Sequence, residues 1–139
     1  MNTWVKVILF GIISGLIWSL IIGGLNAKED SIFVFTAGVI TGVAISLVLK
    51  VPLTKSSWKR TLVFGLISLP LGSFVYWTLF YFLTELVKNE FSNAPFEPIY
   101  LGAYFALMSV LCGFCYFPLS VITTFALKKT IGSGVKSAI

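Results

Sequence analysis

Charged residues are absent from four long stretches, which together cover most of the chain. The stretches are Val7 to Leu25, Ile32 to Leu49, Thr61 to Thr84 and Pro98 to Leu127. A helix of about 20 apolar residues crosses the hydrocarbon core of a bilayer, and its backbone groups are satisfied without water. The pattern therefore predicts an all-α, polytopic membrane protein with four transmembrane helices. With their flanking turns, the predicted spans cover residues 4–25, 31–50, 60–84 and 98–127.

Length and composition leave room for a single domain. The chain has 139 residues, of which 58% are hydrophobic and 11% are charged, so we expect one antiparallel four-helix bundle with short connections. Residues 130–139 have no helical periodicity and are expected to form a flexible cytoplasmic tail. The first apolar stretch is longer than the core of a signal peptide, and it is therefore predicted to be a retained helix.

Basic residues lie mainly on one side of the predicted bundle. Of the ten Lys and Arg residues, all but Lys28 and Lys88 fall on the side of the two termini. Because cytoplasmic segments of membrane proteins are enriched in Lys and Arg, both termini are predicted to be cytoplasmic. These flanking residues also account for the net charge of +5, so we expect membrane lipids and no nucleic acid as partners. Lipid head groups are expected to contact the connection between the second and third spans, at Lys50, Lys55, Lys59 and Arg60.

Small residues recur at every fourth position in the first two spans. Such a row lies along one helix face and allows close packing, which matters because lipid provides no hydrophobic drive for helix association. The rows predict a GxxxG-type contact, either between the two spans of one chain or with another membrane protein. Their members are Gly11, Gly15, Ser19 and Gly23 in the first span, and Gly38, Gly42 and Ser46 in the second.

Two cysteines lie one helical turn apart inside the fourth predicted span, in the sequence Cys112-Gly113-Phe114-Cys115. A pair with this spacing can take part in thiol–disulfide exchange. Together with the count of four helices, the pair resembles the vitamin K epoxide reductase family, which implies a membrane thiol oxidoreductase with Cys112 and Cys115 as redox residues. The loop cysteines that relay electrons in that family have no counterpart here. The alternative interpretation is that both are small packing residues.

Charged side chains are missing from the interior of every predicted span, and the chain has no histidine. Coupled transporters and intramembrane enzymes typically place such groups inside the membrane. We therefore expect no enzymatic activity, no metal and no cofactor. Hydroxyl side chains in the spans either bridge helices or line a polar path. They are Ser14, Ser19, Thr36, Thr41, Ser46, Ser68, Ser73, Thr78 and Ser109.

These features lead to two principal hypotheses for function. In the first, the protein is a non-catalytic accessory, scaffolding or immunity-type subunit that binds other integral membrane proteins through its glycine rows. In the second, it is a small homo-oligomeric channel, exporter or lipid-translocating transporter, lined by hydroxyl groups and by spans that Pro70 and Pro118 are expected to kink. In both, it is a multi-pass protein of a bacterial plasma (inner) membrane.

Overall fold

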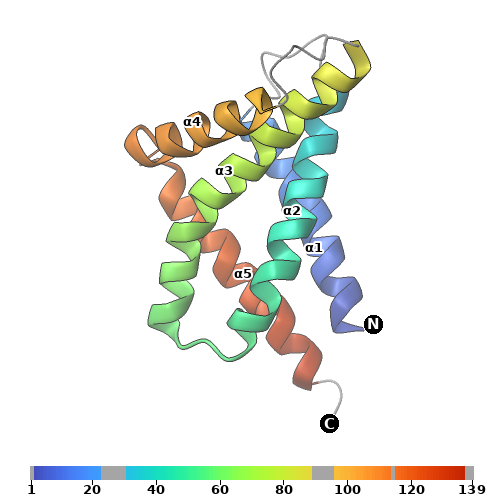
Figure 1. Cartoon of the computed structure of the whole chain (residues 1–139). Coiled ribbons are helices and arrows are strands. Elements are labelled where there is room, and N and C mark those ends of the chain that lie inside the picture. Colours follow the sequence, from blue (N-terminus) through green and yellow to red (C-terminus); the bar gives the residue numbers. More distant parts are fainter. Residues whose placement is uncertain (1, 23–30, 89–95, 114, 137–139) are drawn as a thin grey trace.

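The computed structural model describes residues 2–22, 31–88, 96–113 and 115–136, which form five helices. The long helices α1, α2, α3 and α5 lie side by side, and α4 lies across one end of this bundle (Figure 1). The all-α class predicted from the sequence is therefore confirmed. The bounds of the helices are α1 Thr3–Ile22, α2 Ser31–Thr54, α3 Trp58–Lys88, α4 Glu97–Leu111 and α5 Tyr116–Lys136.

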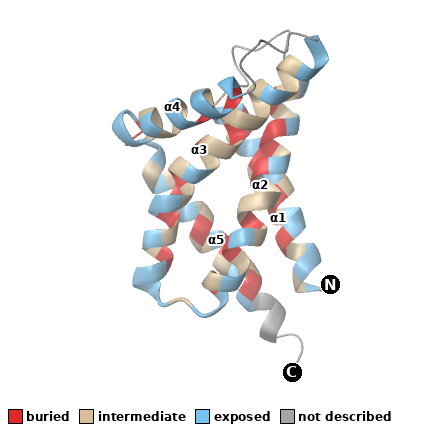
Figure 2. Cartoon of the chain, in the orientation of Figure 1, coloured by how far each residue is buried: buried red, intermediate tan, exposed pale blue. Residues whose placement is uncertain are grey.

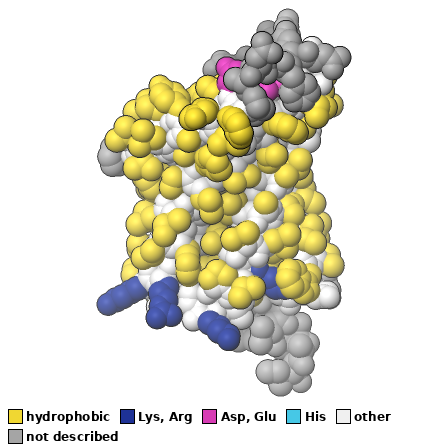
Figure 3. Space-filling model, viewed as in Figure 1, with side chains coloured by type: hydrophobic (Ala, Val, Ile, Leu, Met, Phe, Trp, Pro, Cys, Tyr) yellow, Lys and Arg dark blue, Asp and Glu magenta, His cyan; other side chains and the backbone are white. Residues whose placement is uncertain are grey.

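Three of the helices, α1, α2 and α3, are long and apolar enough to cross a membrane. The pair α4 and α5 adds a fourth crossing if the two helices, which are bent by 101° relative to each other, count as one broken span. Large apolar side chains such as Ile13, Ile17 and Leu20 of α1 are exposed on the outside of the bundle. Apolar side chains also cover most of the face seen in Figure 3. These features are compatible with an integral membrane protein.

The predicted span at residues 98–127 is divided into two helices. Gly113 permits the break, because a Cβ at this position would overlap the carbonyl oxygen of Ser109. The N–H of Cys112 closes α4 by donating to the carbonyl of Met108 over 2.8 Å. At 15 residues, α4 is about 22 Å long, which is less than the hydrocarbon core of about 30 Å.

The two prolines expected to kink their spans differ in their effect. Pro118 lies in the first turn of α5, where a proline is accommodated because its missing N–H has no partner within the helix. Pro70 lies inside α3, and Figure 1 shows that α3 bends along its length. The helix α5 also continues to Lys136, so residues 130–136, which the sequence assigned to a flexible tail, are helical. Residues 137–139 lie outside the described part of the chain.

Apolar clusters pack the bundle at both ends, and Figure 2 shows the buried residues distributed along the inner faces of the helices. The far-end cluster joins the beginning of α2 to the second half of α3 through Val34, Ala37 and Tyr76. The basic-end cluster joins the beginning of α1 to the ends of α2 and α5. It consists of Val7, Leu49, Leu53, Leu127 and Ile131.

The basic-end cluster places the start of α1 and the end of α5 at the same end of the bundle (Figure 1). Lys and Arg side chains gather at this end, and Asp and Glu side chains lie at the opposite end (Figure 3). At the basic end, the ammonium of Lys50 lies 2.8 Å from the ring centre of Trp4. The asymmetry matches the pattern from which cytoplasmic termini were predicted. The side of the membrane that this end faces stays a prediction.

A lysine ties the connection between α2 and α3 to α5. The ammonium of Lys128 donates to the carbonyl of Ser56 over 2.6 Å and to the hydroxyl of Thr61 over 3.1 Å. The Ser56 and Thr61 hydroxyls are themselves 2.8 Å apart, which completes a small polar network. This network fixes the beginning of α3 against α5.

Replacing Lys128 with methionine is expected to lower the free energy of unfolding by about 1–2 kcal/mol, because both hydrogen bonds are lost while the apolar stem is kept. Lys129, which is exposed, provides the control, and Lys129→Met should change stability by less than about 0.5 kcal/mol. The measurement is reversible unfolding in mixed micelles followed by circular dichroism. Equal effects of the two substitutions would contradict the assigned role of Lys128.

Candidate binding cavity

The predicted glycine rows meet each other where α1 packs on α2. A Cβ on Gly11 would lie 2.7 Å from the Cα of Val43, and one on Gly15 would lie 2.8 Å from the carbonyl carbon of Gly38. A Cβ on Gly42 would likewise lie 2.8 Å from the Cα of Gly15. These distances are shorter than a real Cβ contact, so only glycine permits the two backbones to approach this closely.

Ser19 continues the row of α1 and adds a polar contact to α2. Its side chain is fully buried, and its hydroxyl lies 2.8 Å from the carbonyl of Gly15 and 3.2 Å from the carbonyl of Val34. Ser46 is also buried, with an exposed fraction of 3%. Gly23 lies outside the described residues. The helices α1 and α2 therefore pack closely together and form one wall of the bundle.

The opposite wall consists of α3, α4 and α5. A Cβ on Gly65 would lie 2.8 Å from the Cα of Val121, so α3 and α5 are in close contact there. The hydroxyl of Ser73 in α3 donates to the carbonyl of Phe105 in α4 over 3.3 Å, and the ring of Phe105 stacks on Trp77 with centres 4.4 Å apart. These contacts hold α4 against the second half of α3.

Between the two walls lies a cavity of about 270 Å³, which receives side chains from all five helices. Leu49 and Leu127, from the basic-end cluster, line it, and so does Tyr76 from the far-end cluster. The cavity therefore extends between the two clusters inside the bundle. None of the described residues that line it is charged. Gly72 belongs to the lining and leaves open space, because a Cβ on it would meet no atom within 4 Å.

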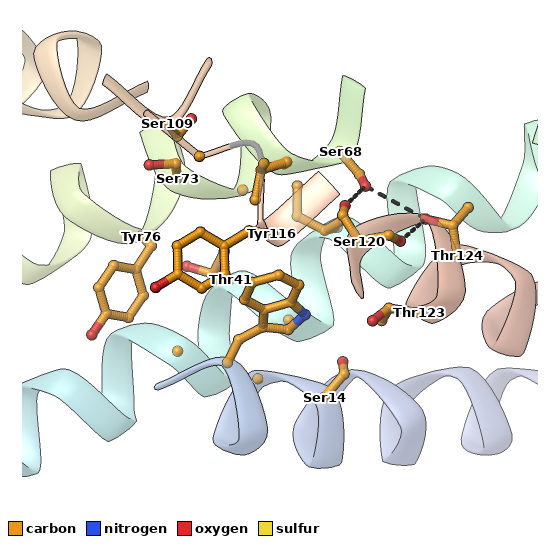
Figure 4. A pocket seen from close by; sticks show the side chains of 18 of the residues that line it. Ser14, Thr41, Ser68, Ser73, Tyr76, Ser109, Tyr116, Ser120, Thr123 and Thr124 are labelled. Atoms are coloured by element: carbon orange, nitrogen blue, oxygen red, sulfur yellow. Dashed lines mark hydrogen bonds between the residues drawn. The ribbon is translucent and has the colours of Figure 1, made fainter. Parts of the chain in front are cut away.

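Most of the hydroxyl groups around the cavity have hydrogen-bond partners, and Figure 4 draws the bonds among Ser68, Ser120 and Thr124. The hydroxyl oxygens of Ser68 in α3 and Ser120 in α5 lie 2.8 Å apart. The Ser120 hydroxyl also donates to the carbonyl of Gly65 over 2.8 Å. Thr124 lies 3.4 Å from Ser68 and donates to the carbonyl of Ser120. The remaining paired hydroxyls donate to carbonyls of their own or a neighbouring helix. They belong to Ser14, Ser73, Ser109 and Thr123.

Two hydroxyls of the lining are buried and have no hydrogen-bond partner. They are Oγ1 of Thr41, a residue that is 8% exposed, and the phenol of Tyr76, which is 4% exposed. A buried polar group without a partner costs about 1–3 kcal/mol. Figure 4 places both residues away from the network of Ser68, Ser120 and Thr124. A bound molecule that reached them would supply the missing hydrogen bonds.

The cavity is partly open, and exposed residues line it near the break between α4 and α5. Cys112 is an exposed free thiol, and Tyr116 is 40% exposed. The ring of Tyr116 contacts the ring of Trp18 in α1 at a centre-to-centre distance of 6.3 Å. These exposed lining residues lie where the break between α4 and α5 approaches α1.

The cysteine pair lies at this break rather than inside a continuous helix. Cys112 ends α4 and Cys115 precedes α5, and both are exposed and free. The glycine rows form the α1–α2 contact, and their members Gly15, Gly38 and Gly42 also line the cavity, as Cys112 does. Of the basic residues, Lys55, Lys59 and Arg60 are exposed around the connection between α2 and α3, as lipid contact requires.

Sequence reasoning anticipated part of the cavity. The hydroxyl residues that the sequence analysis named in the spans include Ser14, Thr41, Ser68, Ser73 and Ser109, all of which line the cavity. Sequence reasoning missed residues whose role depends on how α3 meets α5. Those residues are Gly72, Tyr76, Ser120, Thr123 and Thr124.

Comparison of the chain with protein-family models, with curated proteins and with solved structures gives no match. The cavity and its chemistry are therefore the basis for assigning a function.

Proposed function

We propose that the protein binds a small amphiphilic molecule in the central cavity and moves it between the two leaflets of its membrane. This is the transporter role among the sequence-based hypotheses. The observation that carries it is the cavity of about 270 Å³ lined from every helix. A cavity of about 150 Å³ holds a benzene ring, and ligand pockets begin near 300 Å³. The space is therefore sufficient for a small head group or part of a chain, within a single copy of the protein.

The composition of the lining supports a role in handling a membrane molecule rather than an ion. No described lining residue is charged, and a desolvated ion without a partner is costly in a low-dielectric interior. The exposed lining residues Cys112 and Tyr116 place part of the cavity wall at the surface of the bundle. A membrane molecule could use this side to reach the cavity. Passage to the other leaflet would then require the basic-end or far-end cluster to separate.

The packing of the glycine rows favours this proposal over the accessory-subunit role. Gly11, Gly15 and Gly38 are buried and face the backbone of the other helix of the hairpin. A partner protein would have to use a different surface, such as the exposed face of α1. Native mass spectrometry of gently extracted protein separates the two roles, because a stoichiometric second protein supports the accessory role and a bound small molecule supports the proposal.

Lipid translocation is tested directly with the protein reconstituted in phosphatidylcholine vesicles that contain glucosylceramide with a fluorescent NBD group on its acyl chain. The head of this lipid is uncharged. Dithionite added outside bleaches only the outer leaflet unless the probe crosses. We expect the protected fraction to fall when the protein is present, because the cavity offers the sugar a path away from hydrocarbon.

A leak is excluded by vesicles that enclose water-soluble NBD-glucose, whose fluorescence must survive dithionite. If the protected fraction of NBD-glucosylceramide equals that of protein-free vesicles, lipid translocation is not the function of the cavity.

A further inference from the structure

The hydroxyl groups of the cavity divide into those that are satisfied within the protein and those that are not. Ser68, Ser120 and Thr124 bond to one another or to carbonyls. Thr41 and Tyr76 have buried oxygens with no partner, although each could accept a hydrogen bond and donate one. A ligand gains most where the protein leaves such groups unpaired.

Location distinguishes these two residues from Thr78, whose Oγ1 is also buried without a partner. A Cβ on Gly102 would overlap this oxygen, so Thr78 faces the contact between α3 and α4, and it does not line the cavity. Thr41 and Tyr76 both line the cavity. Of the described residues, they are the two with buried, unpaired hydroxyls that line this space.

The lining residues at the two ends of the cavity differ in their chemistry. Tyr76 belongs to the far-end cluster, whereas Leu49 and Leu127 belong to the basic-end cluster. Apolar side chains of Phe10 and Ile45 pack against that same basic-end cluster and also line the cavity. The space therefore has a polar pole with unpaired hydroxyls at one end. At the other end, apolar side chains lie beside hydroxyls that are already bonded within the protein, such as those of Thr123 and Thr124.

We propose that the ligand is an uncharged amphiphile, whose hydroxyl, ester or amide group bonds to Thr41 and Tyr76 and whose hydrocarbon part extends toward Leu49 and Leu127. The inference rests on the proposed function of the cavity and adds the class and orientation of its ligand. A carboxylate or ammonium is excluded, because none of the described lining residues carries a charge to compensate it. The two hydroxyls offer donors and acceptors that match a neutral oxygen group.

Monoolein, which has two hydroxyls and an ester, is the probe for this inference, and oleate is its charged counterpart. Binding to the full chain in detergent micelles is titrated by native mass spectrometry at a pH where oleate is ionised. We expect one monoolein per chain and weaker binding of oleate. Oleate that binds as tightly as monoolein would overturn the assignment of an uncharged ligand.

Thr41→Val and Tyr76→Phe remove the unpaired hydroxyls and nearly preserve shape. Each is expected to weaken monoolein binding by roughly two- to tenfold, because one hydrogen bond to the ligand is lost. Without ligand, each should leave the melting temperature unchanged or raise it, since an unsatisfied buried group is removed. Thr84→Val is the control, because the Thr84 hydroxyl bonds to the carbonyl of Phe80 and does not line the cavity. It should leave the affinity unchanged.

Unchanged affinity in both Thr41→Val and Tyr76→Phe would overturn the assigned polar pole. The variant Gly72→Leu distinguishes failure of the assigned polar contacts from failure of the proposed function. If Gly72→Leu blocks monoolein while the hydroxyl variants do not, the cavity binds a ligand by a different polar contact. If monoolein binds equally to Gly72→Leu, the ligand is not in the cavity, and both the inference and the proposed function fail.

Discussion

Gly15→Ala is expected to lower the free energy of unfolding by about 1–3 kcal/mol, because the new methyl group overlaps backbone atoms that cannot rotate away. A Cβ at this position would lie 2.8 Å from the carbonyl carbon of Gly38 and would overlap the attached oxygen. Relief requires α1 and α2 to move apart along the whole glycine contact. The hydrogen bond of Ser19 to the carbonyl of Val34 would lengthen with them.

Gly72→Ala is the matched control, and its expected effect has the opposite sign. Gly72 lies inside α3, and its added Cβ would meet no atom within 4 Å. Alanine is favoured over glycine in a helix interior by about 0.5–1 kcal/mol, so this variant should be more stable than the wild type. Both variants are measured by reversible unfolding in mixed micelles with circular dichroism. A Gly15→Ala variant as stable as Gly72→Ala would show that the close α1–α2 contact is absent.

The contrast between these glycines also marks how far the sequence predicts the fold. A regular row such as Gly11 and Gly15 predicts a contact face, since spacing alone puts its members on one side of a helix. The identity of the partner face depends on tertiary packing, and only the structure pairs this row with Gly38 and Gly42. The isolated Gly72 carries no periodic signal.

The division of the fourth predicted span was missed for a related reason. Hydropathy registers apolar length, and residues 98–127 form one long stretch without a charged residue. The signal for a break was local: Gly113 is a residue at which a helix can end, and Pro118 is one that a helix accommodates in its first turn. The sequence analysis expected Pro118 to kink one continuous helix, whereas the structure places it in the first turn of a separate helix, α5.

The cavity was predictable in its chemistry but not in its position. Absence of charge and abundance of hydroxyl groups in the spans both follow from the sequence. Which hydroxyls are satisfied depends on helix rotation: Ser120 reaches the carbonyl of Gly65 because α3 and α5 touch there, whereas Thr41 finds no acceptor. The unpaired groups are thus a property of the assembled bundle, and they carry the functional inference.

Gly72→Leu is expected to reduce NBD-glucosylceramide translocation at least about tenfold, which corresponds to about 1.4 kcal/mol or more in the barrier. The leucine side chain has open space in front of it and would occupy the cavity from the wall of α3 without displacing backbone. Because it buries apolar atoms in an apolar space, the fold should be at least as stable as that of the wild type. Loss of transport with stability retained separates filling of the cavity from unfolding.

The control is Gly132→Leu, which also meets no atom within 4 Å but lies near the end of α5, outside the cavity lining. This variant should translocate the probe like the wild type. Both variants are reconstituted at equal protein-to-lipid ratios, and the dithionite-protected fraction is followed over time. If Gly72→Leu folds and transports at the wild-type rate, the molecule does not pass through the central cavity. In that case the lipid-facing surface of the helices, rather than the bundle interior, would have to provide the path.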